Sequence, residues 1–142
     1  MGRSPLLDKP APPIDLLDLD GRRVRLADLA GRPVIVTFWG SYCIPCREEF
    51  PLLAEVQRRP AARDLAILAV VFKDSPDAAR DFMARYGATW PALLDPGERV
   101  AAAYGVLVPP MTFYIDRSGV VRALSYGPPP RDALETYLAR IL

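Results

Sequence analysis

Two cysteines, Cys43 and Cys46, are the residues whose type and spacing could do chemistry, and the chain has no other cysteine. Ile44 and Pro45 separate them, and Pro45 suits the first turn of a helix because its missing N–H is not needed there. At a helix start, unpaired N–H groups and the macrodipole favour a thiolate, the species that attacks a disulfide. We therefore expect Cys43 to react, and Cys46, one turn further in and more buried, to resolve the mixed disulfide.

A cysteine pair at this spacing can also be half of a metal site or a structural disulfide. The chain has no histidine, which excludes Cys-His catalysis and removes the commonest nitrogen ligand for metals. We therefore predict neither a metal nor another cofactor. A non-catalytic copper-binding module is kept as an alternative, with Met111 the one methionine expected near the pair.

The composition is that of an ordinary globular chain. Of 142 residues, 51% are apolar and 25% are charged, and the formal net charge is +1. This balance gives no reason to expect nucleic acid or an anionic membrane as the partner. No apolar run reaches the roughly 18 residues of a membrane span. The first residues lack the apolar core of a signal peptide, so a cytosolic protein and an exported one without its export segment are both open.

The residues around the cysteines predict the elements that hold them. Pro33–Trp39 is a continuous, β-branched apolar run, which favours a strand buried on both faces. Ile44–Arg59 follows as a helix with an apolar stripe, and Leu65–Phe72 indicates a second buried strand. A strand, a helix and a strand in this order predict a parallel pair with a right-handed crossover. This context favours redox activity of the cysteine pair, which lies at the turn from strand to helix.

The rest of the chain predicts a mixed sheet with helices on both faces. Asp20-Gly21 between two alternating runs indicates an N-terminal β-hairpin. The other expected elements are a helix at 76–86 capped by Ser75, a short helix at 98–104, antiparallel strands at 111–116 and 120–125, and a closing amphipathic helix at 131–142. We expect an α/β fold with one domain over residues 14–142, preceded at 1–13 by an extended arm or tether remnant.

A longer motif surrounds the cysteines, Phe38-Trp39-x-x-x-Cys43-x-Pro45-Cys46-x-x-Glu49-x-Pro51. Residues 110–116 read Pro-x-Thr-Phe-x-Ile-Asp. Two further segments belong to the same overall pattern: residues 18–31, which begin Asp-Leu-Asp-Gly, and residues 95–106, which begin Asp-Pro and end Gly-Val. In this order and spacing they resemble the thioredoxin superfamily, in particular its TlpA/ResA/CcmG-like branch, over nearly all of residues 14–142. The resemblance implies a thioredoxin-like fold with an α-containing insert before the strand that begins at Pro110.

The resemblance also implies a function. Members of this branch are thiol–disulfide oxidoreductases that usually work outside the cytoplasm, often tethered to the membrane. They typically reduce particular protein disulfides, for example in apocytochrome c during haem attachment. The partners expected for this chain are a disulfide-containing protein substrate and an upstream thiol reductant, such as a membrane thiol–disulfide transporter. We expect a monomer in the periplasm or another extracytoplasmic space, with a cytoplasmic location as the alternative.

Carried over to this sequence, the resemblance assigns roles beside the two cysteines. Pro110 corresponds to the cis-proline that faces the disulfide, whereas the residues alone would favour an ordinary trans Pro-Pro loop. The residues expected to contact the substrate are Trp39, Tyr42, Ile44, Pro45, Pro109 and Pro110.

Several positions depart from the family pattern. Tyr42 stands where many members have a second tryptophan, and Thr37 stands where cytosolic thioredoxins have a buried aspartate. Asp74 is then a candidate proton acceptor for Cys46, with a helix-capping role as an equal alternative. Pro109 lacks the N–H with which relatives pair to a bound substrate, which predicts weaker main-chain contact.

Two further expectations concern Glu49 and a different chemistry. Glu49 and Arg47 follow the site on a helix face that we expect to be solvated. A thiol-dependent peroxidase is an alternative function within the superfamily. Its signature, Pro-x-x-x-Thr-x-x-Cys, would need proline and threonine where this chain has Val36 and Gly40.

Overall fold

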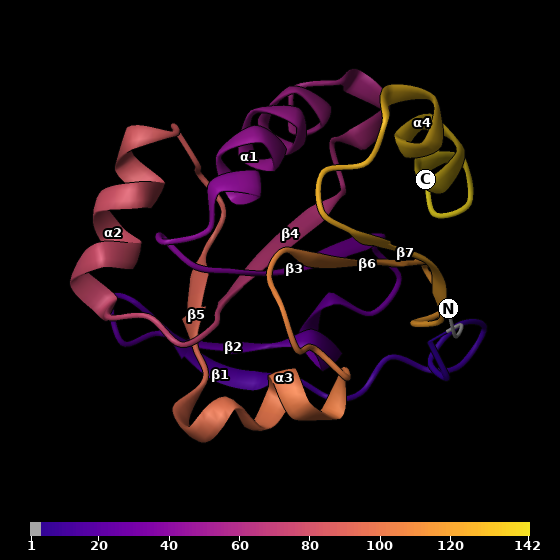
Figure 1. Ribbon diagram of the computed structural model, residues 1–142. Coiled ribbons are helices and arrows are strands. Elements are labelled where there is room, and N and C mark those ends of the chain that lie inside the picture. The colour runs from indigo at the N-terminus through magenta and orange to yellow at the C-terminus, as the bar shows by residue number, and fades with distance from the viewer. Residues whose placement is uncertain (1–3) are drawn as a thin grey trace.

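The structure, a computed structural model, describes residues 4–142. A mixed sheet of seven strands forms the centre of this part of the chain (Figure 1). The strand order is β2-β1-β5-β4-β3-β6-β7. The strands are β1 (Asp15–Asp18), β2 (Arg23–Arg25), β3 (Val34–Trp39), β4 (Ala66–Val71), β5 (Ala92–Leu94), β6 (Met111–Ile115) and β7 (Val121–Tyr126). The helices are α1 (Ile44–Gln57), α2 (Pro76–Arg85), α3 (Arg99–Ala103) and α4 (Arg131–Ala139). None of these helices is long and apolar enough to cross a membrane.

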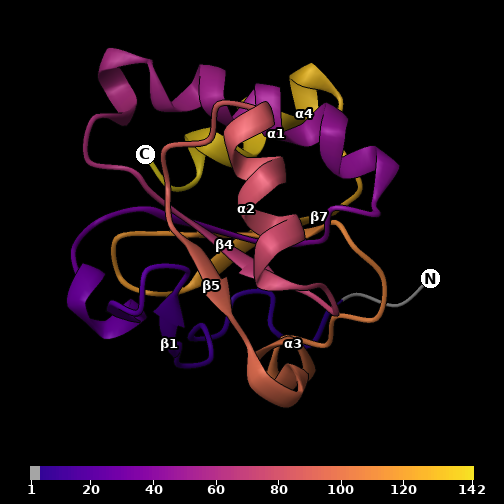
Figure 2. The same ribbon diagram turned by 90° about the vertical axis from the view of Figure 1, so that its left-hand side faces the viewer.

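Helices cover both faces of the sheet, as the sequence predicts. Figure 2 shows α1, α2 and α4 on one side of the strands and α3 on the other. The side chains of β3 alternate between the two sides: Ile35 and Trp39 belong to the apolar cluster under α1, and Val36 and Phe38 to the cluster on the side of α3. Every residue of β3 is buried. The expected strand buried on both faces is therefore confirmed.

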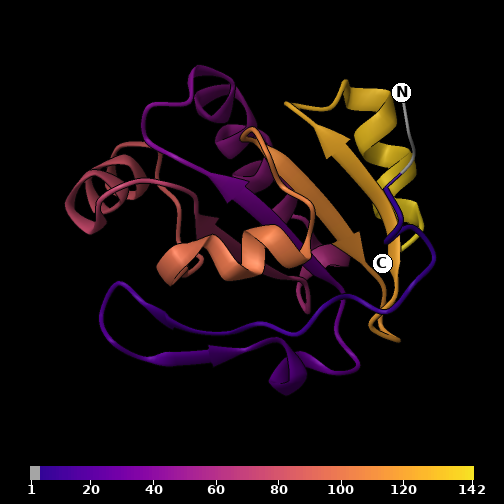
Figure 3. The same cartoon turned by 60° about the horizontal axis from the view of Figure 1, so that its bottom comes forward.

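The predicted strand–helix–strand unit is present. β3 and β4 pair in parallel, and α1 connects them. On its other side β3 pairs antiparallel with β6, so that Phe38 lies opposite Met111, and β6 pairs antiparallel with β7. The end of β3, the start of β6 and the end of β7 therefore lie at one edge of the sheet, namely the edge that the ends of the strands form (Figure 3). The cysteine pair follows β3 at this edge.

The sequence does not predict β5. This strand has only three residues, between Pro91 and Asp95, and so short an apolar run carries no periodicity. Pairing with its neighbours makes it a strand, because it lies parallel to β4 and antiparallel to β1 and so joins the N-terminal hairpin to the sheet. Asp95, which follows β5, accepts hydrogen bonds from the N–H groups of Val100 and Ala101 in α3 at 3.0 and 2.9 Å.

Residues 8–11 of the N-terminal arm pair with the start of β7 and the turn before it, and residues 1–3 of the expected arm are outside the described part of the chain. The Asp8 N–H donates to the Val121 carbonyl at 2.7 Å, and Pro10 forms a β-bridge with Val120. A strand at the edge of a sheet otherwise exposes unpaired backbone groups to other chains. The arm covers part of that edge.

Candidate active site

The two cysteines form a disulfide at the start of α1, directly after β3. Their Cα atoms are 5.4 Å apart. Cys43 is the residue that caps the helix, and its Sγ accepts a hydrogen bond from the Cys46 N–H at 3.3 Å. Cys43 is 5% exposed, whereas Cys46 is fully buried. The sulfur at the helix start is therefore the accessible one, and the Cys46 N–H and the helix dipole would stabilise its thiolate.

Tyr42 forms one side of the turn that leads into Cys43. Its hydroxyl donates to the Phe72 carbonyl at 2.8 Å, while the residue as a whole is half exposed. The ring occupies the space above Gly40, where an added Cβ would lie 2.7 Å from the Tyr42 Cζ atom. Glycine at position 40 thus leaves room for the ring, and Tyr42 is held at the rim of the site.

Asp74 lies beside the same turn. Its Oδ2 accepts from the Ser41 N–H at 2.7 Å and its Oδ1 from the Ser75 N–H at 2.9 Å. Among the described residues, Asp74 makes no hydrogen bond to Cys46. The start of α2 is capped by Ser75, whose hydroxyl accepts a hydrogen bond from the Ala78 N–H at 3.1 Å. The contacts of Asp74 therefore connect the end of β4 to the turn before Cys43.

Glu49 is not on a solvated face, which corrects the expectation from the sequence. It is fully buried, and its two carboxyl oxygens contact the hydroxyls of Thr37 on β3 and Thr112 on β6 at 2.8 and 2.9 Å. Glu49 is buried because it lies on the side of α1 that packs against the sheet. The buried stripe of this helix is Cys46, Glu49, Phe50, Leu53 and Val56. Its helical spacing is the signal that could have placed Glu49 inside.

The hydrogen bonds around Glu49 indicate whether its carboxyl group carries a proton. Thr37, Thr112 and the carboxyl group form a closed ring, because the two hydroxyl oxygens are also 2.8 Å apart. An ionised carboxylate leaves two hydroxyl protons for three contacts, so one pair of oxygens would meet without a hydrogen. A neutral carboxylic acid supplies the third proton. Burial acts in the same direction and raises the pKa of Glu49 from its ordinary 4.5 to about 7.

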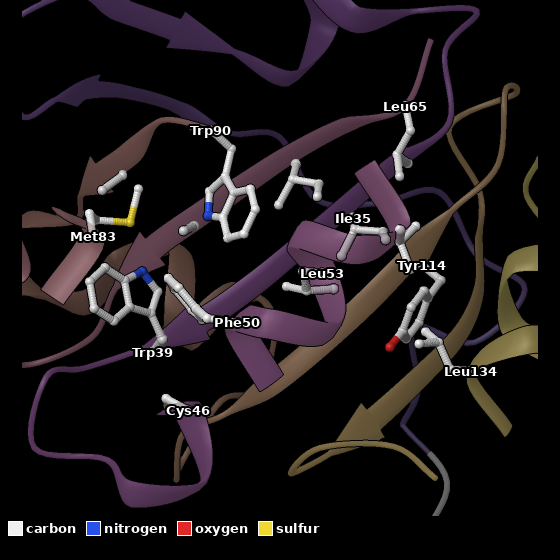
Figure 4. Close-up of a cluster of buried hydrophobic side chains, with 14 of the residues drawn as sticks. Ile35, Trp39, Cys46, Phe50, Leu53, Leu65, Met83, Trp90, Tyr114 and Leu134 are labelled. Carbon is white, nitrogen blue, oxygen red and sulfur yellow. The ribbon is translucent and has the colours of Figure 1, made fainter. Parts of the chain in front are cut away.

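Trp39 is a core residue and cannot contact a substrate from outside, which corrects a second expectation. It is fully buried. Its ring centroid lies 4.9 Å from that of Phe50 on α1 and 4.8 Å from that of Phe82 on α2, and Figure 4 shows Trp39 and Phe50 side by side in this cluster. The side chain faces α1 and α2 because residues of β3 alternate between the two sides of the sheet, and Ile35 and Trp39 lie on the side of these helices. Trp39 thereby supports the turn that carries the cysteines.

The bond between Pro109 and Pro110 is cis, as the family resemblance implies. Pro110 is buried and precedes Met111, which pairs with Phe38 at the end of β3. Its carbonyl accepts from the Gly127 N–H at 2.8 Å. The fold thus brings this proline to the sheet edge from which the cysteine turn leaves. Pro109 is half-buried.

Two residues between the cysteines face solvent. Ile44 is 66% exposed, and Pro45 is exposed in the first turn of α1. The structure therefore gathers the sequence-predicted residues at one sheet edge, apart from Trp39 in the core. Thr37 and Thr112 also lie in this site, as the partners of Glu49. The sequence marks Thr37 as a departure from the family pattern and Thr112 as part of the motif at 110–116, but it does not show their contact with Glu49.

A family model and similar proteins of known name agree on the family of this chain. A family model described as AhpC/TSA family matches residues 7–124. Thiol-disulfide oxidoreductase ResA of Bacillus anthracis is 33% identical over 135 residues, which cover 95% of this chain and 78% of the relative. ResA of Bacillus subtilis (strain 168) is 35% identical over 128 residues, covering 90% and 72%.

A solved structure shows the same fold. The crystal structure described as a thiol:disulfide interchange protein DsbE from Chlorobium tepidum superposes with a TM-score of 0.84 at 34% sequence identity. The match covers 94% of this chain and 97% of that one. The predicted thioredoxin-like fold is therefore confirmed over nearly the whole length.

Proposed function

This chain belongs to the AhpC/TSA family and is a ResA-like thiol–disulfide oxidoreductase, and on that premise we propose that it is a reductase of particular protein disulfides. The observation that carries the proposal is the Cys43–Cys46 disulfide at a helix start, with one sulfur slightly exposed and the other buried. The family resemblance suggests apocytochrome c as substrate and an extracytoplasmic place of action.

The proposed reaction moves two electrons from the reduced protein to the substrate. The Cys43 thiolate attacks one sulfur of the substrate disulfide, forms a mixed disulfide and releases the other sulfur as a thiolate. Cys46 then loses its proton and attacks the Cys43 sulfur, which releases the second substrate thiolate. The protein ends as the disulfide and the substrate as two thiols, whose protons balance those lost by Cys43 and Cys46.

Glu49 is the group best placed to take the Cys46 proton. It lies three residues after Cys46 on α1, a spacing that puts two side chains on one helix face, and both residues are fully buried. An ionised Glu49 in the reduced protein would become, on accepting this proton, the neutral acid that fits the ring with Thr37 and Thr112. For Asp74, the contacts support a role in holding the turn before Cys43.

The disulfide form needs an external reductant for each new cycle. The chain has no third cysteine that could relay electrons internally, so a partner must attack the Cys43–Cys46 bond itself. An upstream thiol protein, such as a membrane thiol–disulfide transporter, is the proposed donor. The protein is proposed to act as a monomer.

Trapping with serine variants tests the function. Reduced Cys46→Ser should accumulate a mixed disulfide with oxidised apocytochrome c, because the resolving thiol is absent, and Cys43→Ser should form none. Non-reducing electrophoresis with mass spectrometry detects the adduct. Alkylation of the reduced wild type across pH should show one thiol with a pKa below the ordinary value of about 8.5. Two ordinary thiols and no adduct would contradict the proposal.

Two alternatives find less support. Val36 is fully buried within β3 and Gly40 has no side chain, so position 40 cannot supply the hydroxyl of the peroxidase signature next to Cys43. A copper-binding module would need Cys43 and Cys46 as free thiolates, whereas both sulfurs belong to the disulfide in this form of the protein.

A further inference from the structure

A second concave surface lies at the end of the strands opposite to the cysteine turn. Ile115 at the end of β6 pairs with Val34 at the start of β3, whereas the cysteine turn follows the end of β3. The length of β3, about 20 Å for its six residues, therefore separates the two places. The turn between β6 and β7 lies at this far end, and the N-terminal arm passes beside it (Figure 3).

Three segments that are distant in the sequence enclose this surface, which we name the distal groove. They are residues 11–15, between the arm and β1, residues 25–30, and the turn at 117–119. The Ala11 N–H donates to the Gly119 carbonyl at 2.9 Å, which holds the arm against the turn. The groove has a volume of about 490 Å³. Sites for small molecules have roughly 300–1,000 Å³, so a ligand of that size fits.

Most of the groove lining is apolar. The side chains that contribute to it are those of Ala11, Pro13, Ile14, Leu26, Ala27 and Ala30. Ile14 is buried and Leu26 is half-buried, and the Leu26 N–H donates to the Ile14 carbonyl at 2.9 Å, so the backbone here is already paired. The apolar part of a ligand would therefore lose water in the groove without leaving a backbone group unpaired.

Arg25 brings an incompletely paired cation to this apolar lining. The charged residues of the lining are Arg25, Arg117 and Asp15. Within residues 4–142, Arg25 has one ion pair, from its Nε to the Asp15 carboxylate at 3.5 Å. Arg23 holds the same carboxylate more closely, at 2.6 Å. The two terminal nitrogens of Arg25 can therefore donate to an anionic ligand, in the forked geometry that suits a carboxylate.

Positive charge also exceeds negative charge around Arg117. Its guanidinium donates to the Asp64 carboxylate at 2.8 Å and to the Gly31 carbonyl at 3.3 Å. Arg32 donates to the Asp64 carbonyl at 2.9 Å. The hydrogen bond from Arg117, with the charges of Arg63 and Arg32, lowers the pKa of Asp64. Three arginines thus share one carboxylate beside the groove, and the excess positive charge attracts an anion.

We propose that the distal groove binds a small amphipathic carboxylate of the medium-chain fatty acid type. The apolar lining takes the hydrocarbon chain, and Arg25 receives the carboxylate. The excess positive charge selects an acid over a neutral molecule of the same length. The site is separate from the cysteine pair, so binding does not require the redox reaction.

Three probes separate the two parts of this recognition. Calorimetric titration of the disulfide form of the full chain compares octanoate, 1-octanol and butanoate. Octanoate should bind most tightly. Octanol should bind about tenfold more weakly, because it loses the hydrogen bond to a charged group. Butanoate, which is four methylene groups shorter, should also bind more weakly by a factor of about ten or more.

Nuclear magnetic resonance locates the bound probe. Titration with octanoate should move the amide signals of residues 11–15, 25–30 and 117–119. The signals of the cysteine turn should stay in place, because the length of β3 lies between the two sites.

Two variants test the assigned residues. Arg25→Gln should reduce the affinity for octanoate to that for octanol and leave octanol binding unchanged. Ala30→Trp should fill the groove and abolish binding of both. Arg85→Gln and Ala84→Trp are the matched controls, because both residues are exposed on α2, and they should bind as the wild type does. Circular dichroism and the rate of disulfide reduction verify that each variant is folded.

Several results would overturn the inference. Equal affinities for octanoate and octanol, or an unchanged octanoate affinity in Arg25→Gln, would refute recognition of the carboxylate. Full binding by Ala30→Trp, or amide shifts at the cysteine turn instead of the groove, would refute the location. Binding only at concentrations where octanoate forms micelles would show adsorption of a detergent and would refute the site.

Discussion

Glu49 and its two threonine partners connect the redox helix to the sheet at the level of single residues. A buried carboxylate is costly unless it is paired, and no cation is among the hydrogen-bond partners of Glu49 in the described part of the chain. The ring with Thr37 and Thr112 satisfies the neutral acid instead. The disulfide form therefore stores a proton one helical turn from Cys46.

This proton makes the stability of the disulfide form depend on pH. The pKa of Glu49 is about 7 in the folded protein and 4.5 as its ordinary value, so the unfolded chain releases the proton first. The stabilising contribution is complete below pH 4.5 and is lost as the pH rises to about 7, by about 3 kcal/mol. Glu49→Gln, whose amide keeps a donor and an acceptor in the ring, should remove this pH dependence. Urea unfolding at several pH values measures it.

Glu48→Gln is the matched control for this experiment, because Glu48 is the exposed neighbour on the same helix. Its unfolding free energy should follow the wild-type pH profile. If Glu49→Gln followed that profile too, the neutral buried acid would be refuted.

At the level of elements, the turn from β3 to α1 depends on how Gly40 and Tyr42 fit together. Gly40→Ala would place its Cβ against the tyrosine ring and displace the hydroxyl from the Phe72 carbonyl. We expect a loss of about 1–3 kcal/mol in the free energy of unfolding. Because the clash is with the ring, the same substitution in a Tyr42→Ala background should cost much less. Equal costs in urea unfolding of both backgrounds would show that the ring is not the cause.

The loop that leads into β6 gives a second prediction at this level. Pro109→Thr restores an N–H beside the cis-proline, and one more hydrogen bond to a substrate backbone is worth about 0.5–1.5 kcal/mol. Reduction of a disulfide peptide should then be about two to ten times faster. 2-Hydroxyethyl disulfide has no peptide backbone and serves as the reference substrate. A peptide rate unchanged relative to this reference would exclude the missing N–H as a limit on binding.

For the whole molecule, the sheet is what assembles the site. The antiparallel pairs β3–β6 and β6–β7 bring the cysteine turn, the cis-proline loop and Tyr126 to one edge, although they are far apart in the sequence. On the other side of β3, the sheet continues through β4 and β5 to the N-terminal hairpin, and the arm covers part of the edge strand β7. α1 and α2 pack against Trp39 and so stabilise the turn that carries the cysteines.

The sequence alone determined the cysteine pair, the helix start and the strand–helix–strand unit, because caps, short spacings and apolar runs are local signals. It also indicated the cis-proline strand through the family motif. Only the tertiary structure decided the burial of Glu49 and Trp39, the existence of β5 and the distal groove beside Arg25. Each of these depends on which distant element packs or pairs against the residue, and one chain's local pattern does not contain that information.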